Sequence, residues 1–184
     1  FVGGSVEATG RYPLTDLFAF VLGVGYGTRP PTMFELAGLA CGPSAQVPSP
    51  GLEPEGNLSA EAGARWNLGI LEGSLFYGFT FFHDFIYPAS ALEAPPAQCS
   101  FEDPFQYFNM ARAWMHSIEL RNHVNIGEAF RIGAVLSWQH GTVKIEQGEG
   151  SSRTWPISLV PPLMGRAFFT VRYPRQYLWA DVRL

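Results

Sequence analysis

The sequence predicts an all-β fold: an antiparallel, up-and-down meander of about eight long strands that forms part of a transmembrane β-barrel. Three observations support this prediction. Apolar and polar side chains alternate over long runs, the runs are longer than strands of soluble domains, and short connections alternate with long ones along the chain.

The clearest alternation lies between Leu58 and Leu68. One set of alternate positions has no polar member and the other has no large apolar member: Leu58, Ala60, Ala62, Ala64, Trp66 and Leu68 against Ser59, Glu61, Gly63, Arg65 and Asn67. After a tight link at 69–72, Leu75, Tyr77, Phe79 and Phe81 continue the apolar set, with Phe76 and Phe82 as exceptions. The period of two, with complete separation of apolar from polar side chains in the first arm, predicts a β-hairpin with one apolar face and one polar face.

The length of the two arms distinguishes a membrane strand from a soluble one. Each arm runs about 10 to 15 residues, whereas strands of soluble domains usually have about 5 to 6. Ten residues tilted by about 45° cross roughly 25 Å, the height of the apolar band of an outer-membrane barrel. Trp66, Tyr77, His83 and Tyr87 are expected near the arm ends, where amphipathic rings favour the headgroup layer. The alternative is a long hairpin of a soluble β-sandwich, whose apolar face would be a core.

Composition agrees with a membrane environment. Of the 184 residues, 47% are hydrophobic and 15% are charged, and Lys144 is the single lysine. Soluble domains carry about 25% charged residues. The net charge of −4 without a basic stripe excludes nucleic acid as an expected partner. No run reaches the ~18 apolar residues of a membrane-spanning helix.

The remaining strands follow in order. Residues 2–13 and 18–27 alternate and form the first pair. The third hairpin begins near Tyr107 and consists of residues up to 126 and residues 130–139, and residues 163–173 and 176–184 form the last hairpin. Gly23, Gly25 and Gly27 lie on one face of the second strand. They lack the Lys-Ser/Thr of a phosphate loop and the spacing of a dinucleotide fingerprint, so we interpret them as strand glycines at a close approach.

The connections are sorted by length. Links near 13–15, 69–72, 127–129 and 174–176 are short, and links at 29–56, 88–106 and 144–161 are long. Because the two kinds alternate strictly, all long loops are expected at one end of the sheet. Short periplasmic turns and long extracellular loops are the asymmetry of outer-membrane barrels.

Four segments resemble the C-terminal half of the barrel of TonB-dependent outer-membrane receptors. They are residues 25–38 (GYGTRPPTMFELAG), 52–55 (LEPE), 107–113 (YFNMARA) continuing through 117–120 (SIEL), and 156–163 (PISLVPPL). Glu53 stands where the family usually has Lys, and Ala111 and Ser117 where it usually has Gly. The order and spacing of the segments over about residues 15–175 make the resemblance specific.

The resemblance implies a barrel of about 22 strands whose lumen holds a plug. Residues 1–184 are then expected to be a single segment of an incomplete barrel, without the plug domain. The implied function is part of a ligand-gated receptor that imports a siderophore-like metal chelate, cobalamin or another bulky nutrient such as a saccharide, energised through TonB. The implied location is the bacterial outer membrane, and the implied partners are its lipid, the ligand, the plug and TonB.

The candidate site residues fall into two groups. Charged residues of the polar face are expected to line the lumen and meet the plug: Glu61, Arg65, Glu119, Arg121, His123, Arg131, Arg166 and Arg172. For any single one of them, a solvated wall whose mixed charges avoid a dry interior is the preferred explanation. Residues in or beside the long loops are expected to contact ligand, since Arg and aromatic side chains anchor interfaces: Arg29, Phe34, Glu35, Phe101, Tyr107, Arg153 and Trp155.

No catalytic residue, metal site or cofactor is predicted. The neighbours His83 and Asp84 would form a dyad only at a bulge, and His116 and His123 fall on opposite faces. Cys41 and Cys99 lie in loop sequence and could pair or stay free. A rival hypothesis is a complete eight-stranded barrel with a structural or adhesion role, in which residues 2–12 would pair with 177–184. A hydrolase, the third hypothesis, would bring Ser, His and Asp together on one face.

Overall fold

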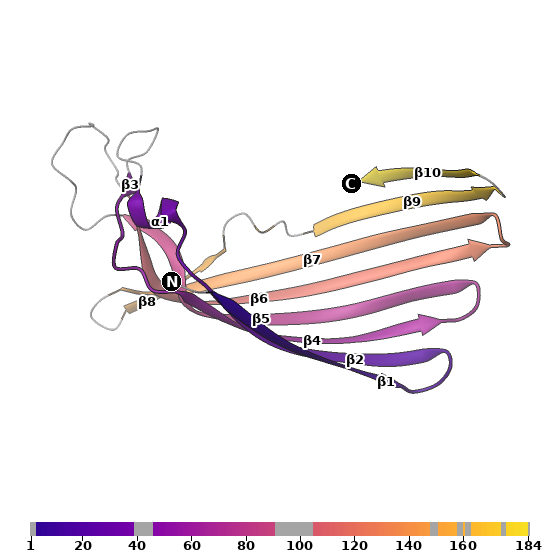
Figure 1. Ribbon diagram of the computed structural model, residues 1–184, viewed down its shortest axis with the longest axis horizontal. Coiled ribbons are helices and arrows are strands. Elements are labelled where there is room, and N and C mark those ends of the chain that lie inside the picture. Colours follow the sequence, from indigo (N-terminus) through magenta and orange to yellow (C-terminus); the bar gives the residue numbers. More distant parts are fainter. Residues whose placement is uncertain are drawn as a thin grey trace.

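The computed structural model describes residues 3–38, 46–90, 105–147, 151–157, 160, 163–173 and 176–183, and within them almost every residue belongs to one sheet of ten strands. Eight strands lie side by side in the order β1-β2-β4-β5-β6-β7-β9-β10 (Figure 1). Their bounds are β1 Gly4–Pro13, β2 Phe18–Arg29, β4 Glu55–Asn67, β5 Leu71–Ser90, β6 Phe105–Ile126, β7 Phe130–Gln147, β9 Leu163–Tyr173 and β10 Gln176–Arg183. Neighbours in this order are antiparallel, which confirms the predicted meander.

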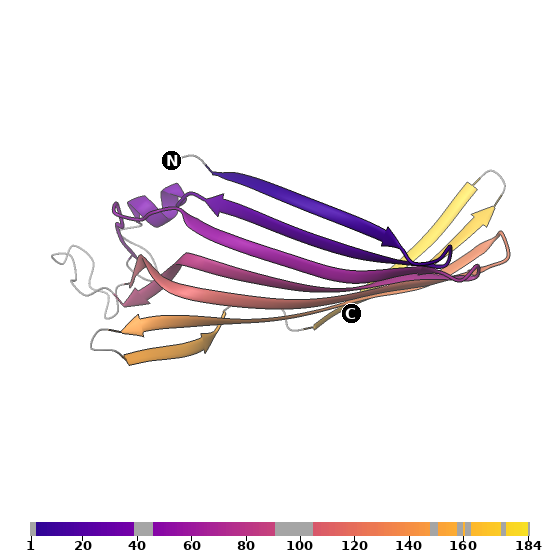
Figure 2. The same cartoon turned by 90° about the horizontal axis from the view of Figure 1, so that it is seen from below.

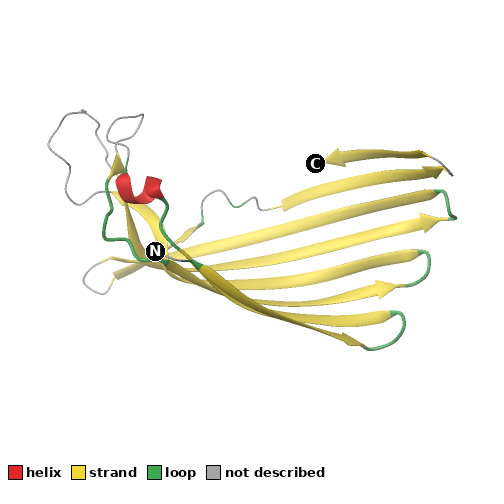
Figure 3. Cartoon of the chain, viewed as in Figure 1, coloured by secondary structure: helices red, strands yellow, loops and turns green. Residues whose placement is uncertain are grey.

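The connections separate the sheet into two ends. The links β1–β2, β4–β5 and β6–β7 gather at one end, together with the end of β9 and the start of β10; we call this the turn end (Figure 1). Helix α1 (Met33–Ala37) and the short strands β3 (Gln46–Val47) and β8 (Ser151–Pro156) lie at the other, which we call the loop end (Figure 3). Gly69 and Gly127 have φ of 80° and 60°, a left-handed conformation that favours glycine, in two of the tight turns.

Two predicted boundaries are wrong at the loop end. Residues 144–156 were expected within a long link, but β7 continues to Gln147 and β8 pairs antiparallel with it. Strands β5 and β6 run 20 and 22 residues, so Tyr77 and His83 lie well inside β5 and not near an arm end. The backbone hydrogen bonds of a neighbouring strand extend these strands beyond the point where turn-forming residues suggest that they stop.

The register separates two faces. Leu22, Ala62, Tyr77, Ile118, Trp138 and Leu163 stand opposite one another across six strands, as part of what we call the apolar face. Glu61, Gly78, Ser117 and Gln139 form the adjacent row on the other side, the polar face. The predicted alternation is therefore confirmed across the sheet, because paired residues of antiparallel strands point to the same side.

The described elements form a single curved layer, and no helix or second sheet among them covers the apolar face (Figure 2). Leu22 is 65% exposed and Val24 58% exposed on that face. A soluble sandwich would bury such residues against a second layer. The described layer therefore lacks the second sheet that a sandwich would place on this face, and it fits lipid as the neighbour of the apolar face.

Side-chain packing in the described part is concentrated at the loop end. Ala113 and Val143 are fully buried, and Phe82, Phe85, Tyr87 and Ile157 pack against them. This cluster explains why Phe82 departs from the alternation, since its ring has an apolar neighbourhood on the polar side of the sheet.

Strands β1 and β10 are the two edges of the sheet, and the described residues contain no pairing between them. The contact that a closed eight-stranded barrel needs is thus not formed in this structure. Among the described residues, no helix has the length and apolar character needed to cross a membrane.

We expect an arginine on the apolar face to cost far more than one on the polar face. Leu136→Arg, at the seventh of the 18 positions of β7, should destabilise the folded full-length protein by about 2–4 kcal/mol, because it places a charge in hydrocarbon. The adjacent Ser137→Arg should cost under about 1 kcal/mol, since residue 137 faces the polar side. Urea titration of the protein folded into lipid vesicles measures both, and equal costs would contradict the assignment of the faces.

Candidate functional site

All eight predicted lumen residues share the polar face by register. Arg65, Ser74, Arg121, Val135 and Arg166 stand in one row across β4, β5, β6, β7 and β9. Glu119 lies in the next row of this face and Glu61 in the row after that, while His123 and Arg131 lie nearer the turn end. Arg172 belongs to the same face by its alternation with Arg166, although its side chain lies outside the described set. The register brings these residues together, and their role toward a plug stays a prediction.

The centre of the polar face is hollowed. A depression of about 330 Å³ is lined by charged groups of both signs, three serines, an amide, a glycine and an aromatic ring: Glu61, Arg65, Ser74, Phe76, Gly78, Ser117, Glu119, Arg121, Ser137 and Gln139. Arg121 donates to Glu119 through Nε–Oε1 at 2.6 Å. The guanidinium carbon of Arg65 lies 5.4 Å from the centre of the Phe76 ring. This lining offers donors and acceptors to a polar molecule in the lumen.

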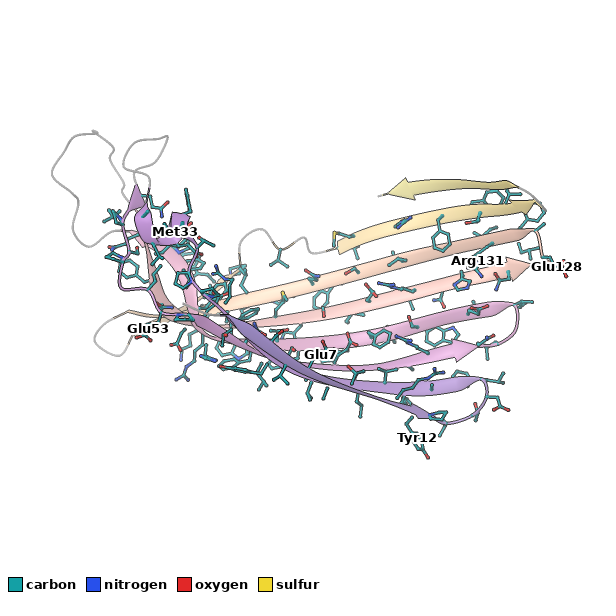
Figure 4. All side chains as sticks on the ribbon, in the orientation of Figure 1. Glu7, Tyr12, Met33, Glu53, Glu128 and Arg131 are labelled. Carbon is teal, nitrogen blue, oxygen red and sulfur yellow. The ribbon has the colours of Figure 1, made fainter. Side chains whose placement is uncertain are left out.

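A second polar cluster ties three strands together at the turn end. Glu72 contacts His123 at 3.2 Å and accepts a hydrogen bond from Asn125 Nδ2 at 2.9 Å. Arg131 Nε donates in turn to Asn125 Oδ1 at 2.8 Å. Figure 4 shows Arg131 at this end of the sheet, beside the turn that carries Glu128. The side chains of His123 and Arg131 are thus bonded to residues of the sheet itself.

At the loop end, Arg29 and Glu35 are bound to each other and to Glu55. Arg29 donates to Glu55 at 2.7 and 3.0 Å and to Glu35 at 3.0 and 3.1 Å. Glu55 is 6% exposed and also accepts the backbone N–H of Ile86 at 3.2 Å. We call Arg29, Glu35 and Glu55 the ion triad. It fastens α1 to the ends of β2, β4 and β5.

Glu35 holds the start of α1 as well. Its carboxylate accepts the backbone N–H of Thr32, while the Thr32 hydroxyl accepts the backbone N–H of Glu35, which together form a capping box. Burial by itself raises the pKa of the Glu35 carboxyl, but the hydrogen bonds from Arg29 and Thr32 outweigh it and leave the pKa below its ordinary value. Glu35 is therefore ionised at neutral pH.

The other ligand-contact candidates divide between exposed and undescribed positions. Phe34 is 48% exposed and meets Tyr107 edge-on, with ring centres 6.5 Å apart. Trp155 is 41% exposed on β8. Arg153 lies on β8, but its side chain is outside the described set, and Phe101, Cys41 and Cys99 lie outside the described residues altogether. Phe34, Tyr107 and Trp155 share the loop end, and ligand contact stays a prediction for each.

Two residues that sequence reasoning did not single out connect the loop end. Glu55 completes the ion triad, and Asn109 bridges two segments: it accepts the N–H of Glu53 at 2.8 Å and donates to the carbonyls of Glu53 and Asp84 at 2.9 and 2.8 Å. Because Asn109 binds the backbone of residue 53, these bonds do not involve the Glu53 side chain. Both residues lie within the segments that carry the resemblance, which was the available signal.

His83 and Asp84 meet because the strand is irregular there. The register shifts between Phe82 and Phe85, Asp84 has φ 53°, and His83 Nδ1 lies 2.9 Å from Asp84 Oδ2. The bulge that such a pair requires is thus present. Tyr26 is the third member, with its hydroxyl 3.4 Å from His83 Nε2. Among the described residues, no three His, Cys, Asp or Glu side chains are placed to hold a metal ion.

Removing the cation of the ion triad should loosen the loop end. Arg29→Gln leaves Glu55 buried without its counter-charge, at a cost on the order of 2 kcal/mol, below that of a fully buried pair because the Arg29 side chain is 40% exposed. Protease cleavage within residues 29–56 of the folded full-length protein should then be roughly thirtyfold faster. Glu53→Gln, which keeps the backbone bonds to Asn109, is the matched control; equal cleavage of the two variants would refute the role of the triad.

The same loop should respond to acid. Since the folded pKa of Glu35 is lowered, its stabilisation is complete above its ordinary pKa of 4.5 and is lost as the pH falls through the lowered value. Hydrogen-exchange protection of the α1 amides, corrected for intrinsic rates, should stay constant from about pH 8 to 5 and fall below that range. In Glu35→Gln, the fall in protection at low pH should be smaller, because the contribution of the Glu35 carboxylate is absent. A pH profile of protection equal to that of the wild type would contradict the role of Glu35.

The comparisons agree with this geometry. The family model described as TonB dependent receptor-like, beta-barrel matches residues 7–183. The solved structure titled "Copper transporter OprC" is 20% identical, with a TM-score of 0.66, over 91% of this chain and 24% of that one. "The FrpB iron transporter from Neisseria meningitidis (F3-3 variant)" is 14% identical, with a TM-score of 0.58, over 97% of this chain and 26% of that one. No curated protein matches the sequence.

These comparisons fix the class of the chain. At such identities the two structures show a common fold, and the chain spans about a quarter of the length of each. The family match covers nearly the whole chain, and barrels of this family lie in the outer membrane of Gram-negative bacteria. The chain belongs to the TonB-dependent receptor-like β-barrel family and is an outer-membrane protein.

Proposed function

We propose that the chain is one wall segment of a receptor that imports a bulky nutrient across the outer membrane, energised through TonB. The observation that carries the proposal is a single layer of long strands with one apolar face, a hollowed polar face, and α1, β3 and β8 together at the end opposite the tight turns. A wall of this kind separates lipid from a polar passage and presents loops to the medium.

In this proposal the loop end receives the ligand. Phe34, Tyr107 and Trp155 supply aromatic surface there, with Phe101 and Arg153 on the same connections. Arg29 and Glu35 act through the ion triad, which sets the position of α1 and thus of Phe34. Aromatic side chains anchor interfaces because they bury large areas at small entropic cost.

The rest of the machinery comes from other parts of the protein. We propose that residues 1–184 are one segment of an incomplete barrel, and that a plug inside the completed barrel changes conformation when the loops bind ligand. Transport then rests on the different affinities of the ligand for the two conformations. The two structures of similar fold are named as copper and iron transporters, which makes metal ions and siderophore-like chelates the first ligands to test, before cobalamin and saccharides.

The complete eight-stranded barrel is the weaker candidate. It requires a seam between β1 and β10, and in the described sheet these strands are the two edges. A structural or adhesion role on a closed barrel therefore has no observation in its favour.

Uptake of a defined nutrient tests the proposal. Cells that lack the gene should take up one of three probes, a ferric siderophore, copper(II) or cobalamin, at least tenfold more slowly than the parent. Loss of TonB should cause the same defect. Uptake that depends on the gene and persists without TonB would reject the energised receptor.

The aromatic contact at the loop end should contribute to the affinity for the nutrient that the uptake assay identifies. Phe34→Ala should weaken ligand binding about tenfold, the effect of losing roughly 1.4 kcal/mol at an interface anchor. Met33→Ala is the matched control, since Met33 is the neighbouring residue of α1 and is 77% exposed. Equal affinities of the two variants would remove Phe34 from the ligand site.

A further inference from the structure

Two cations stand opposite each other on the apolar face, near the loop end. Arg112 of β6 is the register partner of Lys144 of β7, the single lysine of the chain. The register of β6 and β7 continues without a shift from this pair to Ile118 and Trp138, which lie six residues away on each strand. Residues separated by an even number share a face, so Arg112 and Lys144 belong to the same face as Ile118 and Trp138.

Neither cation has a counter-charge within the part of the chain that the structure describes. No hydrogen bond or ion pair is formed there by Arg112, which is exposed, or by Lys144, which is half-buried. The carboxylate nearest to Arg112 in register is that of Asp84, in the bulge of β5, and it is bound to His83 at 2.9 Å. Like charges directly opposite each other destabilise a strand pair, so this pair favours an anion from outside the sheet.

The position of the pair along the strands matches the level of lipid headgroups. Lys144 lies twelve residues beyond Ile132, which is 48% exposed on the apolar face near the turn end. At about 3.3 Å per residue and a tilt near 45°, twelve residues rise by about 28 Å, slightly more than the roughly 25 Å height of the apolar band of a barrel. Trp114, one row before Arg112 on the same face, is of a residue type that favours this boundary.

A hydroxyl completes the row. Thr154 of β8 is the register partner of Lys144, and its side chain is exposed. A guanidinium, an ammonium and a hydroxyl therefore follow one another across three strands at the loop end (Figure 1). Because all three groups can donate hydrogen bonds, we call Arg112, Lys144 and Thr154 the donor row. A guanidinium binds two oxygens of a phosphate at once, and an ammonium binds phosphate as a point charge.

We propose that the donor row binds the phosphate group of a lipid in the leaflet at the loop end, with the acyl chains of that lipid on the apolar rows toward the turn end. A free phosphate ion would use the donor row alone. A lipid also covers the exposed side chains that continue from the row, among them Leu136, which is 46% exposed. The sheet offers both surfaces in one column, which favours the lipid. The inference follows from the outer-membrane location and goes beyond the proposed transport function.

Binding of phosphatidic acid to the full-length protein in detergent micelles tests the site. Diacylglycerol with the same acyl chains is the reference probe, because it differs by the phosphate alone. Native mass spectrometry should show at least tenfold tighter binding of phosphatidic acid than of diacylglycerol. The double variant Arg112→Gln, Lys144→Gln should bind phosphatidic acid about tenfold more weakly than the wild type, since both charged contacts are lost.

The matched control is Arg11→Gln, which removes an exposed arginine on the polar face near the turn end of β1. This variant should bind phosphatidic acid as the wild type does. Equal binding of the two lipids by the wild type, or equal binding of phosphatidic acid by the double variant and the control, would overturn the proposal. Displacement of phosphatidic acid by an equal concentration of inorganic phosphate would assign the donor row to a free anion and would also reject the lipid.

The reactivity of Lys144 gives a second measurement, on the unaltered protein, which covers the case in which the double variant fails to fold. Because Lys144 is the single lysine of residues 1–184, an amine-acylating reagent reports on this one side chain of the segment. Saturating phosphatidic acid should slow its modification at least tenfold relative to diacylglycerol, as measured by mass spectrometry of the peptide. Equal rates would show that no lipid phosphate covers the donor row. Neither measurement uses TonB or uptake, so failure of the transport proposal is recognised separately.

Discussion

The structure depends on one constraint: in hydrocarbon, a backbone N–H or C=O without a partner costs several kcal/mol, so every strand needs a neighbour over its full membrane length. The continuous registers of β2 with β4, β4 with β5 and β6 with β7 satisfy that demand without a gap across the central band. Paired backbone groups are satisfied on both faces of the sheet and favour neither face for lipid. The side chains therefore decide which face meets lipid. The period of two in the sequence is the result.

That same period explains what could be read from the sequence. The alternation of Leu58–Leu68 determines which residues share a side, and antiparallel pairing then carries Arg65, Arg121 and Arg166 into one row. The link lengths indicate which end carries α1 and β8. The faces and the two ends could be predicted because they depend only on neighbouring residues and on the odd or even position of a residue within its strand. Their prediction needs no knowledge of the ligand.

Contacts between distant segments could not be read in this way. Glu55 meets Arg29 and Ile86 across gaps of 26 and 31 positions, and no spacing rule connects them. The continuation of β5 and β6 into residues with turn-forming character depends on the strands beside them. The exceptions Phe76 and Phe82 were visible in the pattern, but their reasons, a cation above one ring and a small buried cluster around the other, required the third dimension.

The irregularity at Asp84 leaves the overall register of β5 and β6 unchanged. Phe82 opposes Ala113 and Ile86 opposes Asn109, so β5 and β6 each advance by four residues across it and the two local shifts cancel. Strand pairing beyond the bulge thus resumes in the original frame. A change of sequence beyond residue 86 is therefore compatible with an unchanged register in the rest of β5 and β6, so the two ends of this strand pair can vary independently of each other.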